Sequence, residues 1–173
     1  MKLISILFLV FIVSKAHSQN EFAATAFYSE FKKVWADAQN GFTTSKGEKR
    51  ISEFEELRNE FEINYLLPLA DSGKIVYPAS GNPYAIFYFE PDKVRLKVDQ
   101  RGANLRDAIV TAYGLPLYAR TETVFINNNP YSNTYYYTDP NETSNAMAIF
   151  RMTIYYKEGK YFLSLEINGK RKL

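Results

Sequence analysis

The chain contains no cysteine and one histidine, His17, which lies near the N-terminus. Because the chain has no thiol, a disulfide framework, a cysteine nucleophile and a thiolate zinc site are excluded. Without an imidazole in the rest of the chain, a Ser-His-Asp arrangement and a histidine pH switch are also excluded. Most of the chemistry by which small enzymes are recognised from sequence is therefore missing.

The N-terminal 18 residues have the pattern of a secretory signal peptide. Lys2 precedes an apolar run over residues 3–13, and small residues occupy positions 16 and 18, where a signal peptidase cleaves. An apolar run of this length is shorter than a membrane-spanning helix requires, and no second long run follows. We expect residues 1–18 to be removed and the product to be secreted or periplasmic, with no membrane span.

The expected product, residues 19–173, has the length of a single domain. Lys2 and Lys15 would leave with the signal, so 19 of the 21 basic residues remain against 19 acidic ones. A chain with no net charge is a poor ligand for nucleic acid, so we expect no nucleic-acid partner. Aromatic residues make up 16% of the chain, and packing rather than cross-linking must stabilise the core.

An amphipathic helix is predicted over residues 21–39. Its apolar residues recur at spacings of four, three and four, which places them on one face, whereas Asp37 and two lysines lie largely off it. Gly41, after Asn40, supplies the left-handed residue that commonly ends a helix. Trp35 is interpreted as a core aromatic. The apolar face comprises Phe27, Phe31, Val34 and Ala38.

The segment that follows is less regular. Residues 42–50 have the polar composition of a loop, and residues 51–60 fit either a helical turn or a strand edge, of which we favour the turn. Alternating apolar residues predict a strand from Phe61, ended by Pro68, and a turn is predicted at 71–73. Strands are then expected at 74–77 and 84–90, the latter central in the sheet because it is apolar on both faces.

A second helix is predicted between Pro91 and Tyr113, with Gly114 after its end. Gly102 falls on its apolar face. This glycine indicates either close packing against a sheet or a division into a strand and a shorter helix from residue 104, since apolar residues also alternate over 94–98.

The last third of the chain has the composition of strands. They are expected at residues 121–126, 134–138, 146–156 and 160–167, with a tight hairpin through Gly159. The whole pattern predicts an α+β domain of αβββαβββ-like order, in which a curved antiparallel sheet carries about two helices on one face. The two halves show no self-similarity at the level of residues.

Residues 31–47 carry a short motif. Read along the chain it is Phe31-x-x-Val34-x-x-Asp37-Ala38-x-Asn40-Gly41-Phe42-x-x-x-Lys46-Gly47. This motif resembles one near the start of uncharacterised small secreted proteins of Bacteroidota. The resemblance implies an origin and an export route, and it carries no catalytic residue.

The candidate binding segment is residues 127–145, which is rich in asparagine and tyrosine. Amide and phenol groups together suit sugars, peptides and other polar partners. The same composition also fits an ordinary β-hairpin with polar turns, and this alternative remains open. The candidate partner-binding residues are Asn129, Tyr131, Asn133, Tyr135, Tyr136 and Tyr137.

The acidic residues identify no catalytic pair or metal site. Five glutamates between residues 53 and 62 are interpreted as a solvated face, and the acids at 139–142 lack the spacing of an EF-hand loop. We therefore predict a non-enzymatic exported binding protein without a cofactor or metal. Its partner is expected to be a protein or peptide, as for a chaperone-like, inhibitor or immunity protein. The alternatives are a carbohydrate-binding accessory protein and a carboxylate-based hydrolase, and the sheet faces leave room for a dimer.

Overall fold

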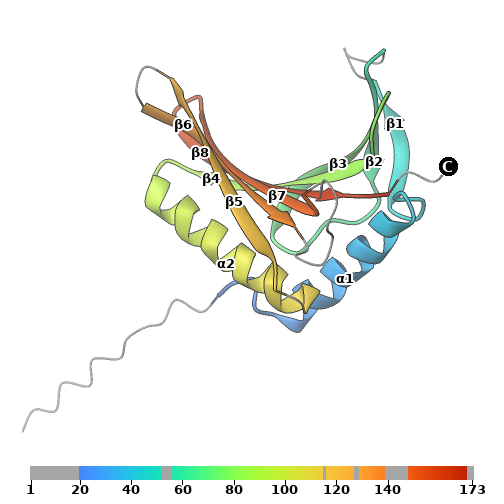
Figure 1. The fold of residues 1–173 in the computed structure, drawn as a ribbon, viewed down its shortest axis with the longest axis horizontal. Helices are drawn as coiled ribbons and strands as arrows, with labels where there is room; N and C mark the ends of the chain where they lie inside the picture. Colours follow the sequence, from blue (N-terminus) through green and yellow to red (C-terminus); the bar gives the residue numbers. More distant parts are fainter. Residues whose placement is uncertain (1–19, 52–55, 115, 127–128, 139–147, 171–173) are drawn as a thin grey trace, which may run out of the picture.

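The computed structural model describes residues 20–51, 56–114, 116–126, 129–138 and 148–170. They form one open, strongly curved antiparallel sheet of eight strands, and both helices lie against its convex face (Figure 1). This arrangement confirms the predicted α+β class with a curved antiparallel sheet and helices on one face. The predicted signal peptide lies outside the described residues.

The chain consists of a helix followed by four strands, and then of the same series again. The first half comprises α1 (Thr25–Gln39), β1 (Lys46–Arg50), β2 (Arg58–Ile63), β3 (Ala70–Pro78) and β4 (Tyr84–Asp92). The second half comprises α2 (Arg95–Tyr113), β5 (Tyr118–Ile126), β6 (Asn129–Thr138), β7 (Phe150–Lys157) and β8 (Lys160–Asn168).

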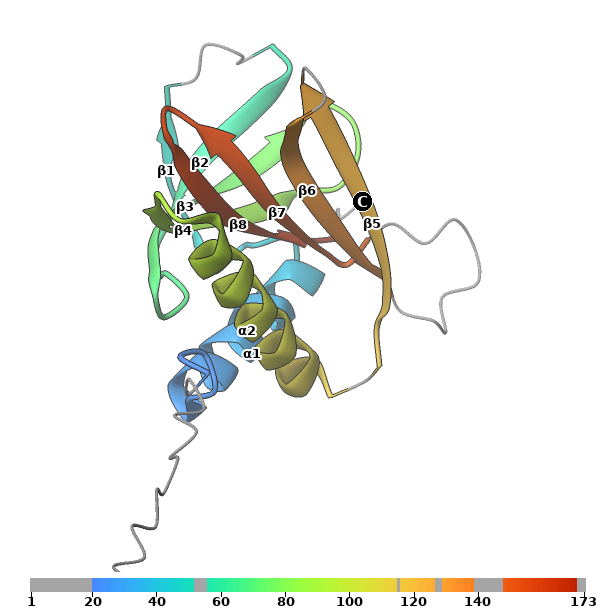
Figure 2. The same ribbon diagram turned by 90° about the vertical axis from the view of Figure 1, so that its left-hand side faces the viewer.

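Each set of four strands is a meander whose last strand lies at the centre of the sheet. The strand order is β1-β2-β3-β4-β8-β7-β6-β5, so β4 and β8 join the two halves, and β1 and β5 form the edges. Viewed from the side, both helices lie under the central strands, and the β5–β6 and β1–β2 pairs rise beyond them as two walls (Figure 2).

Helix α1 has the predicted amphipathic face. Phe27, Phe31, Val34 and Ala38 are all buried, and Gly41 takes a left-handed φ of 72° after the helix ends. Trp35 packs against Phe150 of β7 at a ring-centroid distance of 5.1 Å, as expected for a core aromatic. The prediction for Asp37 was wrong. This carboxylate is buried because it accepts hydrogen bonds from the backbone of Thr44 and Ser45, which turns the chain from α1 into β1.

Two expectations for the first half are corrected by strand pairing. The predicted loop at 42–50 contains β1, a polar strand that forms because it pairs with β2 at the sheet edge. The predicted turn at 71–73 lies inside β3, where a bulge between Ala70 and Ser72 takes up its irregular backbone. Of the helical turn proposed for 51–60, residues 52–55 lie outside the described part, and the strand begins at Arg58, earlier than predicted.

Helix α2 is continuous, so the division into a strand and a shorter helix is wrong. Gly102 lies where the helix packs against the sheet, and a Cβ at this position would lie 3.1 Å from Cδ1 of Ile154 on β7. Close packing is therefore the reason for the glycine. Gly114, with φ of 79°, ends the helix as predicted.

The core lies between the helices and the convex face of the sheet. Every second residue of the central strands points into it, in the period-two pattern of a sheet with one buried face. These residues are Ala85, Phe87 and Phe89 of β4, Leu163, Leu165 and Ile167 of β8, and Phe150, Met152 and Ile154 of β7. No helix in the described part of the chain is long and apolar enough to cross a membrane.

Candidate functional site

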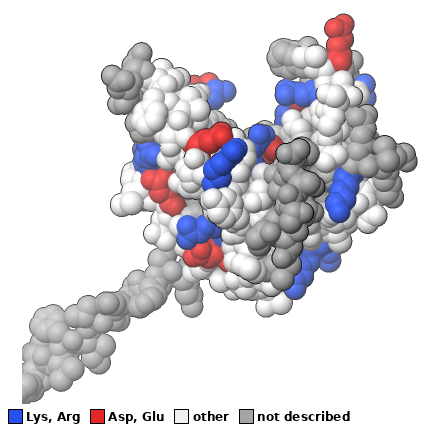
Figure 3. Space-filling model, in the orientation of Figure 1, with Lys and Arg blue, Asp and Glu red and all other residues white. Residues whose placement is uncertain are grey.

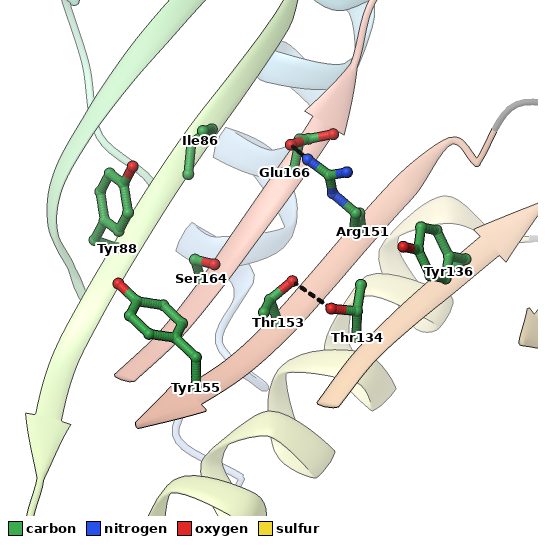
Figure 4. Close-up of a pocket in the computed structure, with 9 residues that line it drawn as sticks. All are labelled: Ile86, Tyr88, Thr134, Tyr136, Arg151, Thr153, Tyr155, Ser164 and Glu166. Carbon is green, nitrogen blue, oxygen red and sulfur yellow. Dashed lines mark hydrogen bonds and ion pairs between the residues drawn. The ribbon is translucent and has the colours of Figure 1, made fainter. Parts of the chain in front are cut away.

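The concave face of the sheet carries the residues that alternate with the core residues. In the space-filling view the molecule is notched between its two raised walls (Figure 3). A hollow of about 310 Å³ lies on the central strands within this face (Figure 4). It is lined by Ile86 and Tyr88 of β4, Ser164 and Glu166 of β8, Arg151, Thr153 and Tyr155 of β7, and Thr134 and Tyr136 of β6.

Strand register arranges these side chains in two rows across the sheet. Residues directly opposite one another on neighbouring antiparallel strands share a face and lie about 5 Å apart. The charged row is Ile86, Glu166, Arg151, Tyr136 and Arg120. The hydroxyl row, two residues along each strand, is Tyr88, Ser164, Thr153, Thr134 and Glu122.

The ion pair between Arg151 and Glu166 lies in the middle of the charged row. The guanidinium donates a hydrogen bond to Oε2 of Glu166, and the side chains of Arg151 and Glu166 are 41% and 8% exposed. Burial raises the pKa of Glu166 above its ordinary value, and the attraction of Arg151 opposes this shift. The pair thus places a half-exposed cation beside a nearly buried carboxylate on the floor of the hollow.

A second hollow, of about 620 Å³, shares Tyr136, Arg151 and Glu166 with the first. It extends the concave surface toward the start of β4, where Tyr84 and the loop at 80–82 line it. Burial raises the pKa of Tyr84, and the charge of Glu166 raises it further. The shared residues make the two hollows one continuous depression, which we call the concave cradle.

The side chain of Tyr136 is held in place by contacts with residues of β5. Its hydroxyl donates a hydrogen bond to Oε2 of Glu122 at 3.0 Å, and the Arg120 guanidinium lies 5.0 Å from its ring centroid. Arg120 and Glu122 form an ion pair at 2.9 Å. Burial and the hydrogen bond to Glu122 raise the pKa of Tyr136. The phenol ring of Tyr136 is therefore held in place by two charged residues of β5.

Apart from Glu122, the residues of the hydroxyl row carry groups that can both donate and accept hydrogen bonds. The hydroxyls of Thr134 and Thr153 lie 3.2 Å apart. Tyr88 and Tyr155 both lie beside Ser164, and burial raises the pKa of both phenols (Figure 4). Tyr155 stacks on Phe162 at a centroid distance of 5.3 Å.

The opposite wall carries a second buried carboxylate, Glu60 of β2. Its two oxygens lie 2.8 Å from Nε of Arg58 and 2.8 Å from Nζ of Lys74. Burial opposes ionisation, but these cations outweigh it and lower the pKa of Glu60. The interpretation of this glutamate as part of a solvated face is wrong, because its side chain is 11% exposed.

The predicted binding residues lie on both faces of one strand. The described part of the segment 127–145 is β6 itself, which forms a hairpin with β5 as the hairpin alternative predicts, while its role in binding stays a prediction. Tyr136 faces the cradle, whereas Tyr135 packs against the core and Tyr137 is 3% exposed. Residues 127–128 and 139–145 lie outside the described part.

The other candidates do not join Tyr136 in the cradle. With its amide oriented to match its neighbours, Asn133 accepts a hydrogen bond from Arg95 of α2 at 2.8 Å, on the helix side of the sheet. Tyr131 is 39% exposed, and Asn129 is the first residue of β6. The buried hydroxyl of Tyr137 has no hydrogen-bond partner among the described residues, and burial raises its pKa to about 12.

Sequence reasoning missed most of the cradle. Polar residues alternate with apolar ones at Arg151, Thr153 and Tyr155 of β7 and at Ser164 and Glu166 of β8. This alternation is the signal of a sheet with one face outside the core, and it could have identified them as a set. Among the described residues no group of three or more acidic or histidine side chains is placed to hold a metal ion.

The geometry suits binding of a polar partner. The cradle combines guanidinium, carboxylate and hydroxyl groups with aromatic rings, and it carries charges of both signs. Comparisons with protein-family models, with curated proteins and with solved structures find no match to this chain.

Proposed function

We propose that the protein is an exported, non-enzymatic binding protein that holds a protein or peptide partner in the concave cradle. The observation that carries this proposal is the asymmetry of the sheet. Two helices cover its convex face, whereas the concave face of the described structure presents a continuous depression lined by polar and aromatic side chains.

The chemistry of the cradle favours a polypeptide. Tyrosine and arginine are enriched at the energetically important positions of protein interfaces, and serine and threonine give adaptable hydrogen bonds. A peptide backbone presents donors and acceptors in alternation, and the hydroxyl row can pair with both. The charged side chains of the cradle are neutralised by ion pairs within the protein, so a partner need not carry a large charge of one sign.

The two buried carboxylates support a binding role over hydrolysis. Glu166 is paired with Arg151, and Glu60 is held by Arg58 and Lys74. A general acid and a nucleophile need one carboxyl that is readily protonated and one that is free to attack. Glu166 has the raised pKa of a general acid, but Glu60 is held on both oxygens by Arg58 and Lys74, so neither buried carboxylate is free to act as the nucleophile.

A carbohydrate is the second candidate ligand. It is favoured by the hydroxyls of Ser164, Thr153 and Thr134, which line the same hollow as the phenol rings of Tyr88 and Tyr155. Aromatic faces with adjacent hydroxyl groups can receive a sugar ring and its hydroxyls. The experiment below therefore includes glycans.

Binding should be tested by selecting ligands from a random-peptide phage library and measuring their affinities by fluorescence anisotropy. Thr153→Arg would place a long cation inside the cradle, whereas Thr111→Arg makes the same change on the exposed surface of α2. We expect the selected peptides to bind the unaltered protein and Thr111→Arg equally, and Thr153→Arg at least about tenfold more weakly, which corresponds to about 1.4 kcal/mol.

Peptides that bind Thr153→Arg as well as they bind the unaltered protein would place the contact outside the cradle and refute the proposal. A glycan array should be probed with the same three proteins. Retention on a glycan that Thr153→Arg abolishes, without any selected peptide, would establish the carbohydrate alternative instead.

A further inference from the structure

Strand β5 is an unprotected edge of the sheet. It is nine residues long, it pairs with β6 on one side, and among the described residues it has no strand on the other. All nine residues are exposed, including Tyr118, Val124, Phe125 and Ile126 at 67%, 53%, 61% and 49%. A long edge strand with exposed apolar residues is a template for pairing with another chain.

The opposite edge of the sheet is built differently. Strand β1 has five residues, and four of them are charged, since its sequence is Lys-Gly-Glu-Lys-Arg. Short length and charged side chains are the usual means by which sheet edges avoid pairing. The contrast singles out β5 as the edge available to a partner.

The sequence of β5 is complementary to itself in one antiparallel register. Two copies can pair about a two-fold axis perpendicular to the sheet. Residues directly opposite each other in an antiparallel pair point to the same side of the sheet, whereas neighbours along one strand point to opposite sides. The axis must therefore lie between the two copies of one residue, and not between neighbouring residues. An axis at Arg120 or at Glu122 brings like charges opposite each other. An axis at Thr121 brings Arg120 of each copy opposite Glu122 of the other.

The same register also matches the remaining residues. Tyr118 faces Val124, Ala119 faces Thr123, and the two Thr121 residues face each other. Opposite charges and apolar pairs directly across an antiparallel ladder each stabilise it, whereas like charges destabilise it. Because the Arg120 guanidinium and the Glu122 carboxylate already lie 2.9 Å apart within one chain, pairing would join the four side chains into one cluster in which each charge neighbours two of opposite sign.

From this complementarity we propose that β5 is a self-association edge, through which two copies of the chain pair in antiparallel fashion about Thr121. The two eight-stranded sheets become continuous, and both concave faces lie on the same side. An edge-to-edge contact buries less than the standard interface of about 1,600 Å², so the dimer dissociates on dilution.

The register can be tested by cross-linking because the chain contains no cysteine. In the proposed dimer the Cα atoms of Thr121 in the two copies lie about 5 Å apart, which a disulfide can bridge. The matched control is Thr123→Cys, which is on the same strand and is also exposed. In the proposed dimer the Cα atoms of residue 123 in the two copies are offset by four residues along the strands, about 13 Å, which no disulfide can bridge.

We expect mild oxidation to convert Thr121→Cys into a disulfide-linked dimer and to leave Thr123→Cys monomeric. Equal cross-linking of the two variants, or none in either at a concentration where sedimentation shows a dimer, would overturn the proposed register.

Charge reversal provides the second test, read by sedimentation velocity over a dilution series. Arg120→Glu should raise the dissociation constant of the dimer about tenfold or more, since two attractive pairs become repulsive. The double variant Arg120→Glu/Glu122→Arg should restore dimerisation, because the exchanged charges are again opposite. The proposal would be refuted if the unaltered protein were a monomer at every concentration. It would also be refuted if the double variant dimerised as weakly as Arg120→Glu while keeping the melting temperature of the unaltered protein.

Discussion

Replacing Arg151 by methionine removes the cation paired with Glu166 but keeps most of the side-chain volume. A hydrogen bond to a charged group contributes about 1.5–3 kcal/mol, and an unpaired buried charge costs about 3–5 kcal/mol. Because the Arg151 side chain is 41% exposed, water already competes for its charge, and we place the loss at about 2 kcal/mol. For a domain of this length that loss lowers the melting temperature by about 4–8 °C.

The loss should depend on pH in a defined direction. Burial already raises the pKa of Glu166 above 4.5, and removal of Arg151 raises it further because the opposing attraction is gone. A group whose folded-state pKa is raised stabilises the protein at low pH and loses that contribution as the pH rises through the folded-state value. The destabilisation by Arg151→Met is therefore largest near pH 7 and smaller below about pH 5.

Urea denaturation followed by the fluorescence of Trp35, the single tryptophan, measures this effect. This residue reports on the core because its ring packs against Tyr113 and Phe150. The matched control is Arg151→Met/Glu166→Gln, in which a neutral amide replaces the carboxylate and the added pH dependence should vanish. A loss for Arg151→Met that is equal at pH 7 and below pH 5 would refute the reasoning.

Three further variants test other parts of the structure by the same assay. Asp37→Asn should cost about 1–3 kcal/mol at neutral pH. Burial opposes ionisation of Asp37, but hydrogen bonds from Ser45 and Thr44 lower its pKa below 3.8, so the difference from the unaltered protein should disappear as the pH falls below that value. Gly102→Val should cost about 1–3 kcal/mol because its Cβ alone would lie 3.1 Å from Ile154; an unchanged stability would show that α2 can move away from the sheet. Phe87→Ala should cost about 3–5 kcal/mol because Phe87 is fully buried, and a loss under 1 kcal/mol would contradict its place in the core.

Both helices and the central strand could be predicted because their information is local. The apolar face of α1 follows from its spacing, and the run at 84–90 lies in β4 at the centre of the sheet. Strand β1 could not be predicted in this way, since its polar sequence forms a strand only through pairing with β2. The glycine at 73 suggested a turn, but it lies in β3, where a Cβ would be 3.0 Å from the carbonyl of Ile86.

The cradle depends on information that a single segment does not contain. Glu166 and Arg151 belong to neighbouring strands of one hairpin, but Ile86 and Tyr88 come from the other half of the chain and reach the cradle only through the pairing of β4 with β8. The composition of the segment places the tyrosines of β6 in one candidate binding set. Residues next to each other on a strand, however, point to opposite faces of the sheet. For this reason Tyr136 lies in the cradle and Tyr135 and Tyr137 do not.

The position of β8 has a consequence for the order in which the protein folds. The strand formed by residues 160–168 is the last of the described strands and lies in the middle of the sheet, between β4 and β7. While a ribosome still holds these residues, β4 cannot pair with β8, and this pairing is the contact that joins the two meanders into one sheet. The native core therefore cannot close during synthesis of the first half. The complete sheet forms only after β8 has been made and can insert between β4 and β7.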